Sequence, residues 1–370
     1  MYLLLHRALR NAGDALIFER GRRLIETFRP DEPLEVAEGW RPLADQVPPA
    51  TLRSARAVVV VGGPGYGNGL AGRYPLGLDP ERDPPLVLLA LGSSVVPGTA
   101  RQLASFRFDG SSRAFLDGVV ARTAYLGARD RTSADILAAN GFERVLMTGD
   151  PAWYDLACLD DPIHRPTAIE RLAFTPPANP LYFDQAFRLA RAAARAFPGS
   201  HGSVVHHRGV QRPFAALARE LGWETVDITG SAAGFGHFDS IDLHLGYRVH
   251  AHLYAISHGI PTYLVAEDSR GIGMLRTLGP LGLAGFGEAA DGPLHRLAMR
   301  YLPRVANAYR PGTHHLGRPV SKAFRMPDVA ERLLPRIQTD LGDGFPGHEA
   351  ARDVVRATLP TMRTMIEALP

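Results

Sequence analysis

Short apolar runs alternate with longer amphipathic stretches along most of the chain. The runs are rich in Val, Ile and Leu and lie at 2–5, 58–61, 86–91, 124–128, 145–147, 203–205, 225–228 and 262–266. Runs of this length and composition are typical of buried strands in parallel sheets. Helical periodicity marks the stretches at 15–28, 134–140, 183–197, 214–221 and 249–256. Strands that alternate with helices in this way predict parallel β-α-β units.

The alternation is interrupted by an Asp- and Pro-rich segment at 160–180. Segments of this composition commonly connect domains, so we interpret it as an interdomain crossing. The sequence therefore predicts an α/β protein with two Rossmann-like, doubly wound domains that face a cleft. The predicted domains cover residues 1–175 and 176–345. The remaining residues, 346–370, predict a C-terminal helix that can pack back on the N-terminal domain.

Composition limits the classes of partner and the compartment. The 370 residues include 41 Lys and Arg against 38 Asp and Glu, and no run of basic residues concentrates the net charge of +3. This balance agrees with anionic ligands and gives no sign of nucleic acid. A single cysteine, Cys158, excludes an intrachain disulfide and a cysteine-based zinc site, and favours a cytoplasmic location. The apolar run at 2–5 is too short for a membrane span, which leaves peripheral contact with a membrane open.

Ionisable side chains are densest between residues 242 and 273. Here Arg248 and His250 stand where a loop enters a predicted helix, so both can act with free backbone N–H groups on an anion. The guanidinium group suits a phosphate or carboxylate, and the imidazole can donate a proton. The alternative is structural, with Arg248 in an ion pair and His250 in the core.

Four histidines in this stretch raise the question of a metal site. His244, His250, His252 and His258 offer imidazole groups, which are common zinc ligands. His250 and His252 would point about 200° apart on a helix, and no two of the four have the i, i+3 or i, i+4 spacing. We therefore expect no metal.

Other polar residues follow predicted strands, where ligands bind in parallel sheets. Arg129 follows the run at 124–128 and can meet an anion from the opposite domain. Glu267, Asp268 and Arg270 follow the run at 262–266 and can orient a sugar, or cap a helix. The loop at 62–69 is rich in glycine but lacks the P-loop lysine and the full dinucleotide fingerprint. It permits close approach to a ligand, or is simply a turn.

Several short motifs in a fixed order resemble the polysaccharide pyruvyl transferase family. They span residues 1–279 and comprise Asn11-x-Gly13-Asp14, Gly62-Gly63, Arg129-Asp130-x-x-Ser133, Gly149-Asp150-Pro151-Ala152 and Gly246-Tyr247-Arg248-Val249-His250-Ala251. The chain departs from the family pattern at 6–10, where a glycine-bearing turn is replaced.

The resemblance implies a GT-B-like fold with an acceptor-side N-terminal domain and a donor-side C-terminal domain. It implies phosphoenolpyruvate as donor, with no separate cofactor, and a sugar diol of a polysaccharide or its precursor as acceptor, lipid-linked or free. His250 would be the general acid and Arg248 would bind the donor. From their places at strand ends and at the central turn, we expect the remaining donor contacts to be Arg129, Gly246, Tyr247, His206 and Arg208; the alternative for His206 and Arg208 is a partly exposed loop. The acceptor contacts would be Asn11, Asp14, Gly63, Glu267, Asp268 and Arg270.

Two other functions fit the same cleft. A GT-B glycosyltransferase would use the arginine to hold the diphosphate of a nucleotide sugar. A non-catalytic carbohydrate-binding protein would need no proton donor at position 250.

Overall fold

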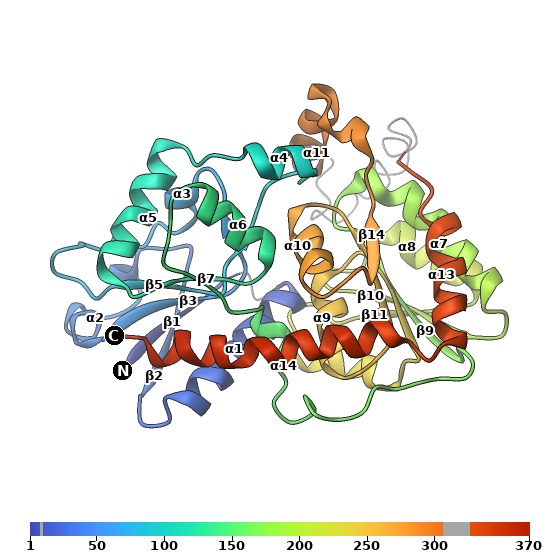
Figure 1. Ribbon diagram of the computed structural model, residues 1–370, viewed down its shortest axis with the longest axis horizontal. Coiled ribbons are helices and arrows are strands. Elements are labelled where there is room, and N and C mark those ends of the chain that lie inside the picture. The colour runs from blue at the N-terminus through green and yellow to red at the C-terminus, as the bar shows by residue number, and fades with distance from the viewer. Residues whose placement is uncertain (8–9, 306–325) are drawn as a thin grey trace.

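The computed structural model describes residues 1–7, 10–305 and 326–370 and divides them into two α/β lobes, which lie side by side in Figure 1. Each lobe is built on a parallel sheet with helices against it. The expected pair of Rossmann-like, doubly wound domains is therefore confirmed.

The N-terminal sheet has the strand order β2-β1-β3-β5, with β7 and β8 continuing it. Its strands are β1 (Tyr2–His6), β2 (Leu34–Glu38), β3 (Ala57–Val61), β5 (Leu86–Leu89), β7 (Leu126–Ala128) and β8 (Val145–Met147). A single bridge between Leu91 and Ala128 joins β7 to this sheet. A small side sheet pairs β4 (Pro64–Tyr66) with β6 (Gly92–Ser93). The helices are α1 (Ala12–Phe28), α2 (Pro49–Ser54), α3 (Leu70–Arg73), α4 (Ala100–Ser105), α5 (Gly110–Arg122) and α6 (Arg131–Ala139).

The C-terminal sheet has the strand order β11-β10-β9-β12-β13-β14, and all its pairs are parallel. Its strands are β9 (Arg171–Thr175), β10 (His201–His206), β11 (Glu224–Asp227), β12 (Leu243–Gly246), β13 (Thr262–Ala266) and β14 (Gly282–Ala284). The helices are α7 (Phe183–Ala196), α8 (Arg212–Leu221), α9 (Val249–Ser257), α10 (Ser269–Thr277), α11 (Pro293–Val305) and α13 (Ala330–Gly342). Short 3-10 turns are η2 (Pro151–Trp153), η3 (Pro180–Tyr182) and η5 (Glu288–Asp291).

The interpretation of 160–180 as a crossing is wrong for its second part. Strand β9 lies within this segment and is the central strand of the C-terminal sheet, between β10 and β12. Its apolar residues Leu172, Ala173 and Phe174 are fully buried. The run is short and its flanks are rich in Asp and Pro, so the composition of the flanks hid a buried strand.

The last helix, α14 (Pro346–Glu367), runs beneath both lobes in Figure 1. It packs against α9 of the C-terminal lobe and against α1 and β8 of the N-terminal lobe. The chain end is held there, because the Tyr2 hydroxyl donates to the Pro370 carbonyl and Arg29 donates to carbonyls of residues 366, 367 and 369. No helix in the described part of the chain is both long enough and apolar enough to cross a bilayer.

One buried cation on α14 tests this docking. The guanidinium group of Arg352 is 1% exposed and donates to the carbonyls of Cys158, Leu159 and Asp161. We expect Arg352→Met to lower the free energy of unfolding by about 2–3 kcal/mol, because these carbonyls lose their donor while the hydrocarbon packing is kept. Chemical denaturation measures the change.

The control is Arg363→Met on the same helix. Arg363 is exposed, pairs with Glu367 one turn away and lies over the Phe28 ring, so its loss should change the free energy of unfolding by less than about 1 kcal/mol. Equal effects of the two substitutions would contradict the assigned role of Arg352.

Candidate active site

Both sheets have a point at which the strand order reverses, and loops leave such a point in opposite directions to form a crevice. In the C-terminal sheet the reversal lies between β9 and β12, and in the N-terminal sheet it lies between β1 and β3. The topology therefore predicts a ligand site at the loops that follow these four strands.

A pocket lies between the domains at these loops. Its lining comes from segments that follow β1, β3, β7, β9, β10, β12 and β13. The lining residues are Asn11, Asp14, Pro64, Arg129, Ala178, His207, Tyr247, Arg248, Val249, His250, Glu267, Asp268, Arg270 and Gly271. Nine of the residues predicted from sequence are brought together here, from both domains.

The turn from β12 into α9 depends on a glycine. A Cβ atom on Gly246 would lie 2.4 Å from the carbonyl oxygen of Thr175 on the neighbouring strand. Without it, the backbone N–H of Tyr247 donates to that oxygen, at 3.0 Å. Arg248 then becomes the N-cap of α9, and its side chain makes no capping bond. The helix therefore begins at the pocket, where its dipole favours an anion.

His250 stands in the first turn of α9 and touches the opposite domain. A Cβ atom on Gly13, in the first turn of α1, would lie 2.0 Å from the Nδ1 atom of His250. The backbone N–H of Ala12 donates to the carbonyl of His207 at 3.0 Å, so the two domains are also bonded here. Gly13 thus lets two helix starts meet, and the imidazole lies between them.

The imidazole of His250 is neutral at physiological pH in this structure. Burial, followed by the nearby cations Arg129, Arg270 and Arg248 in that order, lowers its pKa to about 3. Its Nε2 atom is buried and has no hydrogen-bond partner among the described residues. A buried polar atom without a partner costs free energy, so its presence in a pocket points to a bound ligand.

Arg129 enters the pocket from the N-terminal domain. Its side chain is fully buried and pairs with Asp130 at 3.2 Å and with Asp150 at 3.5 Å. Gly92 makes room for it, since a Cβ atom there would lie 2.0 Å from the Nε atom of Arg129. The Nη2 atom has no partner within the described ranges and, like the Nε2 atom of His250, is available to a ligand.

Asp130 and Asp150 orient Arg129 and do not reach the pocket lining themselves. Asp130 caps α6 by accepting from the backbone N–H and the hydroxyl of Ser133, at 2.8 and 2.9 Å. Asp150 accepts from the backbone N–H of Ala152 at 2.9 Å. Burial raises the pKa of Asp150, although Arg129 opposes this shift. The two carboxylates fix the orientation of the Arg129 guanidinium group, because each is itself held by another hydrogen-bond donor.

Glu267 is bound at both oxygens by the loop after β9. The backbone N–H groups of Ala178 and Asn179 donate to its two oxygens at 2.6 and 3.0 Å. Burial raises its pKa to about 7, against the opposing effect of Arg248. The carboxyl group therefore holds the loop in place, and its charge changes near neutral pH.

Asp268 and Arg270 form a two-pronged ion pair at the start of α10. Three bonds of 2.6–3.1 Å join the guanidinium group to the carboxylate, which also caps the helix. Across the cleft, burial raises the pKa of Asp14, while the hydrogen bond from Asn11 and the charge of Arg270 lower it. Asn11 caps α1, as its Oδ1 atom accepts from the backbone N–H of Gly13. The family pattern departs at residues 6–10, and of these residues 8–9 lie outside the described residues.

Four predicted residues lie outside the pocket lining: Gly63, His206, Arg208 and Gly246. His206 is buried, and its Nδ1 atom accepts from the backbone N–H of Gln211. Arg208 is exposed, and its charge opposes the upward shift in the pKa of Asp14. Tyr247 lines the pocket, but its hydroxyl donates to Gln185 in the domain core.

His207 replaces His206 in the pocket. Successive side chains at a strand end point to opposite sides, so a shift of one residue exchanges which histidine faces the ligand. Burial lowers the pKa of His207 well below its usual value, with Arg248 adding to the effect, and its Nε2 atom has no partner in the described chain. The sequence signal for His207 was the pair of adjacent histidines, but the pair alone did not show which of the two side chains faces the pocket.

The other histidines of the 242–273 stretch are occupied elsewhere. His244 and His252 both bond the hydroxyl of Thr262 in the core. His258 belongs to the one group within the described residues whose donor atoms are close enough for a cation, together with Asp155 and Cys158. There the Nη2 atom of Arg20 lies 3.0 Å from both Asp155 and His258, so a guanidinium group already occupies the place of a cation.

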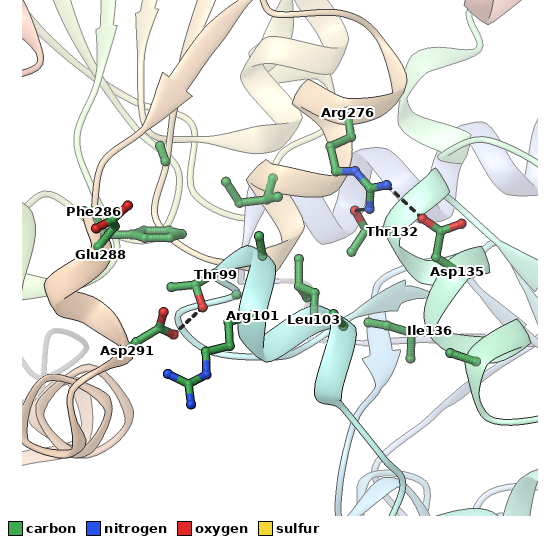
Figure 2. A pocket seen from close by; sticks show the side chains of 17 residues that line it. Thr99, Arg101, Leu103, Thr132, Asp135, Ile136, Arg276, Phe286, Glu288 and Asp291 are labelled. Atoms are coloured by element: carbon green, nitrogen blue, oxygen red, sulfur yellow. Dashed lines mark hydrogen bonds and ion pairs between the residues drawn. The ribbon is translucent and has the colours of Figure 1, made fainter.

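A second and larger interdomain cavity, of about 1110 Å³, lies beyond α10 and is lined mostly by apolar side chains of α4, α6, α10 and β14 (Figure 2). Two cross-domain contacts border it. Arg276 donates to Thr132 and Asp135, at 3.1 and 2.9 Å, and the Thr99 hydroxyl donates to Asp291. It contains none of the residues predicted from the sequence, but it adjoins the first pocket through α10.

The smaller pocket can bind an anion and move a proton. It combines a helix start, three arginines and three buried nitrogens without partners among the described residues, namely His250 Nε2, Arg129 Nη2 and His207 Nε2. Carboxylates face them from both domains. Cations and helix starts stabilise bound or developing negative charge, and an imidazole within reach transfers protons.

Comparison with known proteins places the chain in a family. A family model described as polysaccharide pyruvyl transferase matches residues 11–269. No curated protein sequence matches. Similar solved structures include UDP-GlcNAc 2-epimerase from Neisseria meningitidis, with 10% identity, a TM-score of 0.48 and coverage of 97% of this chain and 100% of that one.

Two other similar structures are a S. aureus MnaA–UDP complex and the wall teichoic acid polymerase TagF. The first has 12% identity, a TM-score of 0.45 and coverage of 92% of this chain and 96% of that one. The second has 11% identity, a TM-score of 0.43 and coverage of 100% and 90%. The family model covers more than two thirds of the sequence and includes every predicted pocket residue except Arg270, so this chain belongs to the polysaccharide pyruvyl transferase family.

Proposed function

We propose that this protein transfers the pyruvyl group of phosphoenolpyruvate to a sugar diol of a polysaccharide or its precursor. The products are a cyclic pyruvate ketal and phosphate. The observation that carries the proposal is the pair of buried nitrogens without described partners, His250 Nε2 and Arg129 Nη2, which face one pocket from opposite domains. A donor that bears both a carboxylate and a phosphate can satisfy several such donors at once.

In this proposal the C-terminal domain binds the donor. Arg248 and the start of α9 bind one anionic group of phosphoenolpyruvate, and Arg129 reaches it from the N-terminal domain. The acceptor then lies on the side of Asn11 and Asp14, where the Asp268–Arg270 pair offers further hydrogen bonds to hydroxyl groups. The close contact of Gly13 with His250 keeps the two sides within reach of each other.

The reaction begins with a proton from His250 to the methylene carbon of phosphoenolpyruvate. This makes C2 electrophilic, and one sugar hydroxyl attacks it. The C2–O bond to phosphate then breaks, and the second hydroxyl closes the ring at C2. Of the two hydroxyl protons, one returns to His250 and the other leaves with phosphate, so the protein ends in its starting state.

The test is phosphate release from phosphoenolpyruvate with a panel of p-nitrophenyl glycosides that differ in the hexose. Release that depends on a glycoside, together with a pyruvylated product in mass spectrometry, supports the proposal. Release of UDP or CDP from a nucleotide sugar, with no phosphate from phosphoenolpyruvate, would assign the cleft to a glycosyltransferase instead.

Removal of the proton donor should slow the chemical step. We expect His250→Gln to lower kcat at least about a hundredfold, in line with the usual contribution of general acids. The matched control is His201→Gln, since His201 is exposed at the start of β10, and it should keep the wild-type rate. Unchanged kcat in the His250 variant would remove this residue from the mechanism.

Removal of the helix-start cation should weaken donor binding. We expect Arg248→Ala to raise the Kd for phosphoenolpyruvate by roughly tenfold to a hundredfold, because a hydrogen-bonded charge contact is lost. Isothermal titration calorimetry measures it, and Arg212→Ala, at the exposed start of α8, is the control. A Kd equal to that of the wild type would place the donor elsewhere.

Donor binding should also take up a proton. The pKa of His250 is about 3 in the free protein, and the negative charge of phosphoenolpyruvate should raise it in the complex. A group whose pKa rises on binding favours the complex at low pH, so affinity should fall as pH rises from about 3 to the pKa in the complex and then level off.

Calorimetry at pH 6.5 in two buffers with different ionisation enthalpies counts the protons. The wild type should take up more protons than His250→Gln. The phosphate group of the donor contributes equally in both proteins, so subtracting the two values leaves the proton uptake of His250. Equal proton uptake by both proteins would show that His250 stays neutral in the complex.

A further inference from the structure

Helix α11 has an apolar stripe on its outer face. Leu294, Leu297 and Tyr301 are 76%, 58% and 42% exposed, which makes the two leucines the most exposed large hydrophobic residues of the described chain. The spacing of three and four residues places all three on one side of a helix. The helix packs on the core of the C-terminal domain through Met299, on the far side from the stripe, and through Ala298, which borders the stripe next to Leu294.

The helix is also basic and contains no acidic residue. Arg296 is exposed, and in the sequence Arg300 and Arg304 follow at intervals of four residues. The sequence continues without Asp or Glu from residue 292 to residue 327. The nearest acids, Glu288 and Asp291, precede the helix, and Asp291 accepts a hydrogen bond from Thr99. The whole chain has a net charge of only +3, so this part of the sequence carries an excess of positive charge, although its basic residues are spaced apart and form no run.

An apolar stripe beside arginines is the pattern of helices that lie flat in a membrane interface. Such a helix buries its apolar face at the level of the headgroups and attracts anionic lipids with its cations. The charge pattern favours a lipid surface, because anionic headgroups present negative charge to several spaced arginines at once while the apolar stripe enters the interface.

The position of α11 agrees with this. The helix begins two residues after Asp291, which lines the large interdomain cavity. Figure 2 shows the apolar side of this cavity, to which Leu103, Ile136 and Phe286 belong. In Figure 1 the helix lies at the same edge of the molecule as α4, across from the α14 side. A membrane at this edge would therefore face the cavity and not the back of the domains.

We propose that this protein docks on an anionic membrane surface through the Leu294–Leu297–Tyr301 stripe of α11. The stripe enters the headgroup region, and the basic side of the helix contacts anionic lipids. Docking orients the interdomain cavity toward the bilayer. This proposal does not depend on the pyruvyl transfer reaction, since it concerns a surface outside the catalytic pocket.

Vesicle co-sedimentation of the full chain tests the proposal. The probes are vesicles of phosphatidylcholine alone and of phosphatidylcholine mixed with phosphatidylglycerol. The wild type should sediment with the anionic vesicles, and binding should weaken as salt is raised, because salt screens the charge contacts. We expect the double variant Leu294→Gln/Leu297→Gln to bind at least about tenfold more weakly.

The control is Leu156→Gln, which makes the same change at a leucine that is 41% exposed outside α11 and should leave binding unchanged. Circular dichroism and thermal unfolding check that each variant folds. Wild-type protein that stays in the supernatant with anionic vesicles overturns the proposal, as does equal binding by the double variant. A dimer that forms in solution and is lost in the double variant, without vesicle binding, would overturn it by assigning the stripe to a second copy of the chain.

Discussion

The close approach of two helix starts across the domain boundary is the constraint on which this site depends. Helices α1 and α9 lie side by side with their starts together, and Gly13 meets His250 where no Cβ atom fits. The same helices are joined farther along by Arg20, whose guanidinium group donates to the Ser257 hydroxyl and lies 3.0 Å from His258. One contact brings the imidazole to the cleft, and the other fixes the angle at which the helices meet. Each domain alone would hold half of the pocket.

Electrostatics follow from this geometry. The imidazole lies among arginines and away from water, and it therefore stays neutral until negative charge arrives. Burial also raises the pKa of a nearby carboxyl group, Glu267, to about 7, although two backbone N–H groups donate to it. In the free protein the charges of the arginines are therefore partly compensated by carboxylates, and the His250 imidazole is uncharged. Binding of a multiply charged anion would compensate the arginines further and would favour the charged form of the imidazole.

The sequence predicted the architecture and the central turn because both depend on local signals. Strand–helix alternation requires only periodicity, and a helix start after Gly246 places Arg248 and His250 by its own geometry. Strand β9 was missed because its five residues carry no signal stronger than their Asp- and Pro-rich flanks. The sequence predicted His206 where the structure has His207, because the exact end of the strand decides which side chain faces the pocket. The partners of Glu267 lie 88 and 89 residues away, and no local pattern specifies contacts at that separation.

The hydrogen bond from the Ala12 amide to the His207 carbonyl has one more consequence. This amide is the first of its helix and would ordinarily exchange its hydrogen freely with solvent, but here its acceptor belongs to the other domain. Its rate of hydrogen exchange therefore measures how often the two domains separate, independently of the stability of either one. A single backbone position thus reports any separation of the two domains.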